Sequence, residues 1–291
     1  SGDKTAKLWN LQGEELITFT GHSNAVIAVA FSPSGEFLAT ASRDDTAKLW
    51  NLQGESLITF TGHSNRVTAV AFSPSGEFLA TASGDDTAKL WNLHGEELIT
   101  FTGHSSLVTA VAFSPSGEFL ATASRDDTAK LWNLQGESLI TFTGHSNRVT
   151  AVAFSPGGEF LATASYDNTA KLWNLQGEEL ITFTGHSDWV WAVAFSPGGE
   201  FLATASHDNT VKVWDLQGNL LADFRGYKGN LLQGEPDFIE LESPVNCVCF
   251  SPDGKQIVAG YEDGKVRFWP VESLPELIAR GKAWLGVEGG N

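Results

Sequence analysis

The sequence predicts an all-β protein in which one four-stranded antiparallel sheet recurs around a ring. Gly-His pairs begin at regular intervals of 41 residues, at Gly21, Gly62, Gly103, Gly144 and Gly185. Tryptophans keep the same step, at Trp9, Trp50, Trp91, Trp132, Trp173 and Trp214. A fixed period of this size is the mark of a repeat architecture.

Each period holds four short strand patterns, as the unit 62–102 illustrates. The apolar runs Val67–Phe72 and Phe78–Ser83 are separated by the turn sequence Ser-Pro-Ser-Gly. Thr87–Leu93 then alternates polar and apolar residues, and a His-Gly turn leads to Leu98–Thr102. Short runs of β-forming residues bounded by Gly, Pro, Asp and Ser predict strands joined by tight turns.

An isolated sheet of this kind leaves apolar surface exposed on both faces. Packing the copies radially covers each face with a neighbouring blade, and closing the ring protects the end blades. We therefore predict a β-propeller, in which each period supplies one four-stranded antiparallel blade.

The Gly-His pair, the Trp-Asn pair (Trp214-Asp215 in the last full unit) and the spacing resemble the WD-repeat family over about nine-tenths of the chain. The resemblance implies a hydrogen-bonded structural set of His, Ser, Asp and Trp in each blade. The matching residues are His22, Ser42, Asp44, Trp50; His63, Ser83, Asp85, Trp91; His104, Ser124, Asp126, Trp132; His145, Ser165, Asp167, Trp173; and His186, Ser206, Asp208, Trp214. In the last repeat Asp263 and Trp269 remain, but Tyr261 replaces Ser and no His is recognisable.

The repeats divide the chain into a propeller, 1–271, and a tail, 272–291. Five full repeats occupy 21–225, preceded by a half-blade at 1–20. Trp269 follows Trp214 by 55 residues, so an insertion at 226–243 precedes a divergent last blade at 244–271. Six innermost strands accompany seven Trp strands. Strand counting favours six blades and the family resemblance favours seven; we expect seven blades, with six as the alternative.

The tail predicts a short amphipathic helix packed on the propeller. Ser273-Leu-Pro-Glu276 fits a capping box, and apolar residues recur at helical spacing up to Gly286. The tail resembles that of bacterial, especially cyanobacterial, WD-repeat signalling proteins. That resemblance implies a sensor or interaction domain of a larger protein.

Composition restricts the partners. Asp and Glu outnumber Lys and Arg by 35 to 18, giving a formal charge of −17, so nucleic acid and anionic membranes are poor partners. No apolar run is long enough for a membrane helix. Cys247 and Cys249 replace alanines of other repeats and are interpreted as buried core residues. The absence of disulfides predicts a cytoplasmic setting.

Catalysis and metal binding are both weakly indicated. A Ser-His-Asp combination recurs in five units, whereas a catalytic triad occurs once and needs an oxyanion site. The Asp44-Asp45 pair and its copies lack the further oxygen ligands of a Ca²⁺ loop and suit tight turns. We therefore expect no enzyme activity, no cofactor and no metal.

The residues that differ between near-identical repeats are the candidate binding residues. Counted from the Gly of each Gly-His pair, positions 5, 7 and 23 vary most, from Ala to Arg to Trp. In WD-repeat propellers these positions lie on the top rim around the central channel. The predicted rim residues are Trp189, Trp191, Tyr166, His207, Arg43, Arg66, Arg125, Arg148 and Leu107.

The variation favours a non-catalytic scaffold that binds a protein or peptide on this rim, because aromatic residues and Arg commonly anchor interfaces. Drift at exposed sites and packing between blades are the structural alternatives. A carbohydrate-binding, lectin-like propeller is the alternative function. We expect a monomer, although near-identical blades would also permit a strand-swapped oligomer.

Overall fold

The computed structural model describes residues 1–225, 227–228, 238–239 and 243–271, all of them in strands, turns and loops. Five sheets have four strands each: β3 (Val26–Phe31) to β6 (Ser56–Phe60), β7 (Val67–Phe72) to β10 (Glu97–Phe101), β11 (Val108–Phe113) to β14 (Ser138–Phe142), β15 (Val149–Phe154) to β18 (Glu179–Phe183), and β19 (Val190–Phe195) to β22 (Leu220–Phe224). Their middle strands are β4 (Phe37–Ser42), β5 (Ala47–Asn51), β8 (Phe78–Ser83), β9 (Ala88–Asn92), β12 (Phe119–Ser124), β13 (Ala129–Asn133), β16 (Phe160–Ser165), β17 (Ala170–Asn174), β20 (Phe201–Ser206) and β21 (Val211–Asp215).

Three smaller sheets complete the described chain. Before the first full blade, β1 (Thr5–Trp9) pairs with β2 (Glu15–Thr20). After the last, β25 (Val245–Phe250), β26 (Gln256–Tyr261) and β27 (Val266–Pro270) form a three-stranded blade. Between them, β23 (Tyr227–Lys228) pairs with β24 (Phe238–Ile239).

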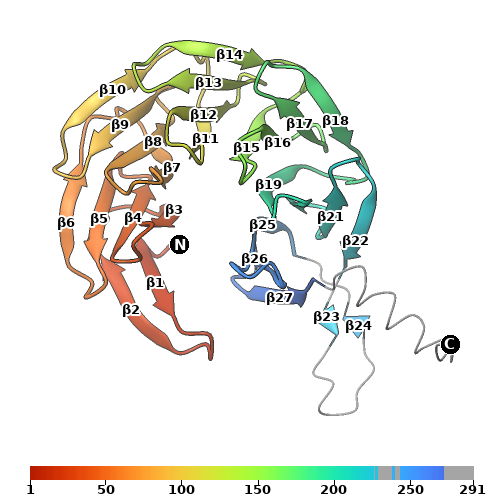
Figure 1. Cartoon of the computed structure of the whole chain (residues 1–291). Coiled ribbons are helices and arrows are strands. Elements are labelled where there is room, and N and C mark those ends of the chain that lie inside the picture. The colour runs from red at the N-terminus through yellow and green to blue at the C-terminus, as the bar shows by residue number, and fades with distance from the viewer. Residues whose placement is uncertain (226, 229–237, 240–242, 272–291) are drawn as a thin grey trace, which may run out of the picture.

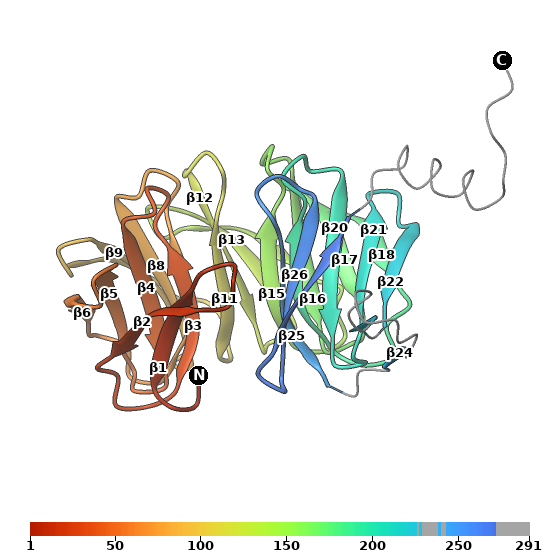
Figure 2. The same cartoon turned by 90° about the horizontal axis from the view of Figure 1, so that it is seen from below.

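The blades are arranged around a central opening, with the first strand of each blade innermost (Figure 1). Seen from the side, they form a thick arc one strand-length deep (Figure 2). The arc is open between the β1–β2 sheet and the β25–β27 blade (Figure 1). Every pairing within the blades is antiparallel, as between β11 and β12.

The second strand of each four-stranded blade is buried on both faces because other sheets lie on either side of it. In β8, for example, Leu79, Ala80 and Ala82 have no exposed surface, although successive side chains point to opposite faces. Small residues are required there, since each blade tapers towards the centre and the neighbouring sheets are close. This explains why the sequence Phe-Leu-Ala-Thr-Ala-Ser recurs unchanged.

The repeated tryptophan joins each blade to the one before it. Trp132 is 1% exposed and packs in a cluster with Leu90, Phe101 and Leu120, which belong to both blades. Its ring meets Phe101 edge-on, with centroids 5.6 Å apart. Trp9 occupies the same repeat position but is 51% exposed, because no blade precedes β1 in the described chain.

The inner strands of adjacent blades are also linked by a threonine at position 7. The Thr109 hydroxyl donates to the Val149 carbonyl of the next blade at 2.7 Å. Thr68 and Thr150 make the same bond to Val108 and Val190, at 2.5 and 2.6 Å. These bonds hold neighbouring inner strands close together around the opening.

Replacing Thr109 by Val should therefore lower the free energy of unfolding by about 1 kcal/mol, because it removes one hydrogen bond while keeping the β-branched shape. Urea denaturation at neutral pH measures the effect. Ile27 occupies the same repeat position without a hydroxyl, so Ile27→Val is the matched control and should change stability less. Equal stability of Thr109→Val and the parent protein would contradict the linking role.

One prediction needs correction, and another falls outside the described residues. The described residues build six blades and two two-stranded sheets, so the preference for seven blades is not supported. The reason is that β1 and β2 correspond to the third and fourth strands of a repeat, and the described chain supplies no inner strands for them. The predicted C-terminal helix falls in 272–291, outside the described residues, and the described residues contain no helix.

The cysteines are likewise not buried core residues. Cys247 and Cys249 are both exposed, because β25 lies in the blade at one end of the open arc (Figure 1). At the other end, Val29 and Phe31 of β3 are similarly exposed, at 54% and 51%. Within the described part of the chain, no helix is long and apolar enough to cross a membrane.

Candidate partner-binding site at the mouth of the ring

The topology of a blade brings two variable positions together at one end of the ring. In an antiparallel four-stranded sheet, the turn between the second and third strands lies at the same end as the link entering the first strand. Position 23 lies in that turn and position 5 in that link. A backbone bond joins them: the Arg125 amide donates to the Leu107 carbonyl at 2.9 Å. Equivalent bonds join Arg43 to Ala25, Gly84 to Arg66, Tyr166 to Arg148, and His207 to Trp189.

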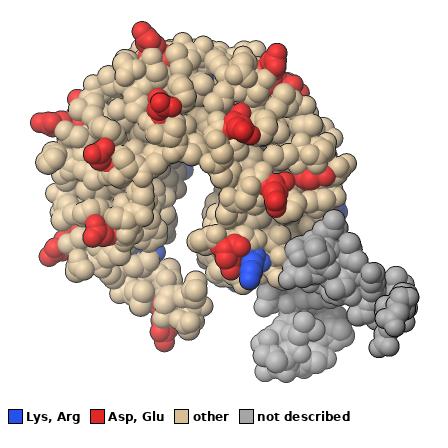
Figure 3. Space-filling view, in the orientation of Figure 1, with Lys and Arg blue, Asp and Glu red and all other residues tan. Residues whose placement is uncertain are grey.

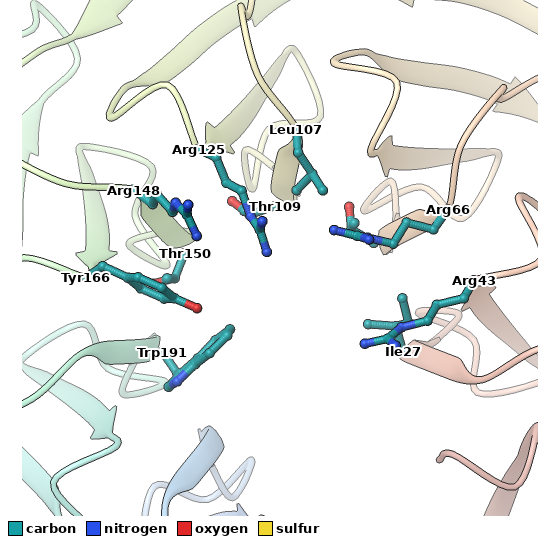
Figure 4. Close-up of a pocket in the computed structure, with 11 residues that line it drawn as sticks. Ile27, Arg43, Arg66, Leu107, Thr109, Arg125, Arg148, Thr150, Tyr166 and Trp191 are labelled. Carbon is teal, nitrogen blue, oxygen red and sulfur yellow. The ribbon is translucent and has the colours of Figure 1, made fainter.

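These positions surround a pocket of about 230 Å³ in the central opening. Figure 4 shows side chains from five blades pointing towards its centre. The lining residues are Ile27, Arg43, Arg66, Thr68, Leu107, Thr109, Arg125, Arg148, Thr150, Tyr166 and Trp191. Trp189 and His207 lie at its edge, in contact with the lining aromatic rings. The predicted rim residues are thus near one another, although they are spread over 165 residues of sequence from Arg43 to His207.

One side of the pocket is cationic. Each of the first four full blades contributes one arginine, alternately from position 23 and position 5: Arg43, Arg66, Arg125 and Arg148. No ion pair joins any of these guanidinium groups to a carboxylate of the described residues. Burial, together with the positive charges of Arg148 and Arg66, lowers the pKa of Arg125 below its ordinary value. The charges therefore repel one another in a partly desolvated space.

The other side of the pocket is aromatic. Tyr166 stacks on Trp189, with ring centroids 4.3 Å apart and the planes 1° from parallel. Trp191 meets Tyr166 edge-on at 5.2 Å and also lies 5.2 Å from His207. Arg148 lies 5.8 Å from the Tyr166 ring, which connects the two sides. The Trp191 indole nitrogen is buried and has no hydrogen-bond partner among the described residues.

Acidic side chains also lie at the opposite end of the blades. The turn between the first two strands ends in Glu36 or its copies, and the turn between the last two ends in Glu55 or its copies. Figures 1 and 3 view the ring from the side opposite to Figure 4, since the colours run round it in the reverse direction. Asp and Glu are distributed over that face, with few Lys or Arg (Figure 3). The pocket is thus a local cationic region in an acidic protein.

The structural sets lie behind this surface. In the third full blade, His104 Nδ1 contacts Asp126 Oδ2 at 2.8 Å and His104 Nε2 contacts Thr122 Oγ1 at 2.7 Å. The Trp132 indole nitrogen donates to the same Thr122 oxygen at 2.8 Å. Threonine therefore joins His to Trp, a role that the family pattern of His, Ser, Asp and Trp did not assign. The corresponding residues are Thr40, Thr81, Thr122, Thr163 and Thr204.

Serine has a different partner from the one that a nucleophilic triad requires. The Ser124 hydroxyl donates to the Ser106 carbonyl at 2.9 Å and accepts from the Asp126 amide at 3.1 Å. Its oxygen is therefore occupied with turn geometry, while both nitrogens of His104 contact Asp126 and Thr122. These bonds hold the turn between the second and third strands in place, but they do not bring the Ser124 hydroxyl to a histidine that could activate it.

The second aspartate of each turn has a backbone role. Asp45, Asp86 and Asp127 have φ near +67°, and Asn168 and Asn209 take the same conformation at 68°. Asp and Asn tolerate this left-handed region better than other residues with a side chain. Among the described residues, no group of three or more His, Cys, Asp or Glu side chains is placed to hold a metal ion.

Some lining residues were not among the predicted rim residues. Ile27, Thr68, Thr109 and Thr150 all line the pocket. They occupy position 7, the same variable position as Trp191. Their position in the repeat could therefore have placed them at the pocket, although Ile and Thr are not residue types that suggest a binding site. Three repeats have Thr at this position because its hydroxyl also bonds to the inner strand of the next blade.

Comparison with known proteins agrees with the repeat pattern. The family model described as IFT122 first beta-propeller matches residues 1–229, and the WD domain, G-beta repeat model matches residues 238–270. A 44-residue stretch is 50% identical to "Nuclear distribution protein nudF 2" of Aspergillus clavatus and covers 15% of this chain. Over the same length, identity is 48% to "Nuclear distribution protein PAC1" of both Arthroderma otae and Tuber melanosporum.

The match spans only 10% of the length of these curated relatives. They are fungal proteins, so the expected bacterial or cyanobacterial type is not supported. By its sequence matches and its antiparallel four-stranded blades, the chain belongs to the WD-repeat β-propellers, in the family described as IFT122 first beta-propeller.

Proposed function

We propose that the protein is a non-catalytic scaffold that binds a protein or peptide at the pocket in the central opening. WD-repeat propellers are typically protein-interaction scaffolds, which gives the general class of function. The residues proposed to bind the partner are the four pocket arginines with Leu107, Tyr166, Trp189, Trp191 and His207.

A single observation carries the proposal: the positions that vary between near-identical repeats surround one pocket. Packing between blades accounts for the stack of Tyr166 on Trp189, but neither packing nor drift accounts for the four arginines. Trp189 remains 39% exposed although it stacks on Tyr166. An exposed aromatic ring held rigidly by its neighbour loses little conformational entropy on binding. The four arginines, which form no ion pair with a carboxylate in the part of the chain that the structure describes, add charge that a partner can neutralise.

Replacing Trp189 and Trp191 together by Ala should weaken peptide binding at least about 30-fold, since even one central aromatic anchor contributes about 2 kcal/mol or more. Peptides can be selected against the parent protein from a random phage-displayed library and their affinities measured by fluorescence anisotropy. Trp9→Ala is the matched control, because Trp9 is exposed but lies away from the pocket. Unchanged affinity in the folded double variant would refute the proposed site.

The same pair of variants separates the peptide proposal from carbohydrate binding. A glycan array probed with the parent protein should show no signal that depends on Trp189 and Trp191. A signal lost in the double variant would favour the lectin-like alternative. A cytoplasmic setting and a role in signalling remain predictions that rest on cysteine usage and on the resemblance of the tail.

A further inference from the structure

The arginine side of the pocket has no structural explanation within the described chain. Elsewhere, buried or half-buried cations have partners: Lys89 bonds to Glu97 at 2.8 Å, and Lys212 bonds to Asp223 at 2.6 Å. Arg267 likewise bonds to Asp263 at 2.7 Å. Among the described residues, the four pocket arginines have no such ion pairs, although Asp45, Asp86 and Asp127 lie in turns at the same end of the blades.

We propose that this pocket binds a phosphomonoester group presented by a partner protein, such as a phosphorylated Ser, Thr or Tyr side chain. The inference rests on the proposed scaffold function and specifies the chemistry of the partner. Arg43, Arg66, Arg125 and Arg148 are the residues that hold the group.

Charge favours phosphate over a carboxylate. One carboxylate brings a single negative charge, whereas a phosphomonoester carries about −1.5 to −2 at neutral pH and has three acceptor oxygens. Guanidinium groups present forked donors that match phosphate oxygens in pairs. Several guanidinium groups that point towards one small space are suited to a compact ligand with several oxygens (Figure 4).

The distribution of the arginines over the blades also supports a ligand. Each arginine belongs to a different blade, and it comes from position 23 in two blades and from position 5 in the other two. The paired position then holds Ala25, Gly84, Leu107 or Tyr166, so each of the four blades contributes one cation and no second cation. Two different sequence positions thus give the same result, one positive charge per blade around the pocket.

Burial strengthens the expected interaction. Burial and the neighbouring charges of Arg148 and Arg66 already lower the pKa of Arg125, which shows that its positive charge is not fully solvated. A phosphate dianion in the pocket would relieve this repulsion.

The experiment uses the whole chain and two peptide libraries. One library carries a fixed central phosphoserine, phosphothreonine or phosphotyrosine in random sequence; the other has the unmodified residue or Glu at that place. We expect the phosphorylated library to be enriched, and inorganic phosphate at millimolar concentration to compete with the selected peptides. Arg66→Gln and Arg125→Gln should each weaken binding about tenfold or more.

The matched control is Lys130→Gln, which removes one charge from a lysine bonded to Thr141 on the outer strands. It should leave phosphopeptide affinity within about twofold of the parent value, because an exposed distant charge is largely screened. Thermal unfolding supplies an independent readout: Arg125→Gln should keep or raise the Tm, since it relieves like-charge repulsion. A lowered Tm with unchanged peptide affinity would mean that the arginine is structural, and would overturn the proposal.

The proposal also fails if enrichment is equal in the two libraries, or if only free nucleotides bind and phosphopeptides do not. These failures are distinguishable from failure of the scaffold function. If peptides without phosphate bind and lose affinity in the Trp189→Ala, Trp191→Ala variant, the scaffold function stands and the phosphate site alone is rejected.

Discussion

Replacing Trp132 by Ala is expected to lower the free energy of unfolding by about 3–5 kcal/mol, the usual cost of deleting a fully buried large aromatic side chain. The change removes a ring that packs between two blades, and the indole donor to Thr122 at 2.8 Å. Urea denaturation followed by far-UV circular dichroism measures the loss. Intrinsic fluorescence is less suitable, because the chain has ten tryptophans.

Trp9→Ala provides an unusually close control. Trp9 and Trp132 occupy the same repeat position in the same local sequence Ala-Lys-Leu-Trp-Asn, yet Trp9 is 51% exposed and Trp132 is 1% exposed. The Trp9 variant should therefore lose less than about 1 kcal/mol. If the two variants were equally destabilised, local sequence and not packing between blades would account for the effect, and the account of blade contacts would be wrong.

Acidification is expected to destabilise the protein strongly, through five repeated aspartates: Asp44, Asp85, Asp126, Asp167 and Asp208. Burial alone would raise the pKa of Asp44, but bonds from Thr46, His22 and the Ser23 amide outweigh it and lower the pKa to about 2. A carboxyl whose pKa is lower in the folded than in the unfolded state stabilises the fold at higher pH. That stability is lost as the pH falls from about 4 through the folded pKa.

Two histidines act in the same direction. Burial lowers the pKa of His22 and of His63, although the bonded aspartate in each case opposes the shift. Their neutral forms are thus favoured by folding, and protonating them costs stability as the pH falls below about 6.5. Stability should be nearly constant between about pH 7 and 8, decline gently below about 6.5, and decline steeply below about 4. Asp44 alone accounts for about 2 kcal/mol of the steep part.

Urea denaturation at a series of pH values measures this profile, and neighbouring aspartates give a sharp comparison. Asp126→Asn should lower stability at pH 7 and reduce the acid-induced loss by roughly one fifth, since one of five titrating sets is removed. Asp127→Asn should follow the parent profile, because Asn168 and Asn209 already occupy that turn position with the same φ. An unaltered acid branch in Asp126→Asn would show that the sets do not govern acid stability.

The sequence by itself determined the blade, its strands and the order in which they pair. The 41-residue period and the turn residues are local signals, and every strand in the repeats follows from them. The sequence also identified positions 5, 7 and 23 as the variable ones. Near-identical repeats make this comparison possible within a single chain, since residues constrained by packing recur unchanged while the others stand out.

Only the tertiary structure decided how these residues meet. Arg43 and Arg148 are distant in sequence, and their convergence on one pocket depends on the curvature of the arc. The bonds from His104 and Trp132 to Thr122 could not be predicted from the repeat pattern. Thr122 lies in a strand whose sequence is the same in all five full repeats, so nothing in that sequence distinguishes its hydroxyl as a partner of His and Trp. Trp9 occupies a position that is buried in other blades, and Cys249 a position that is half-buried in them; each is exposed because it lies at an open end of the arc. Burial is a property of the neighbouring blade, and a repeat sequence does not state whether that neighbour is present.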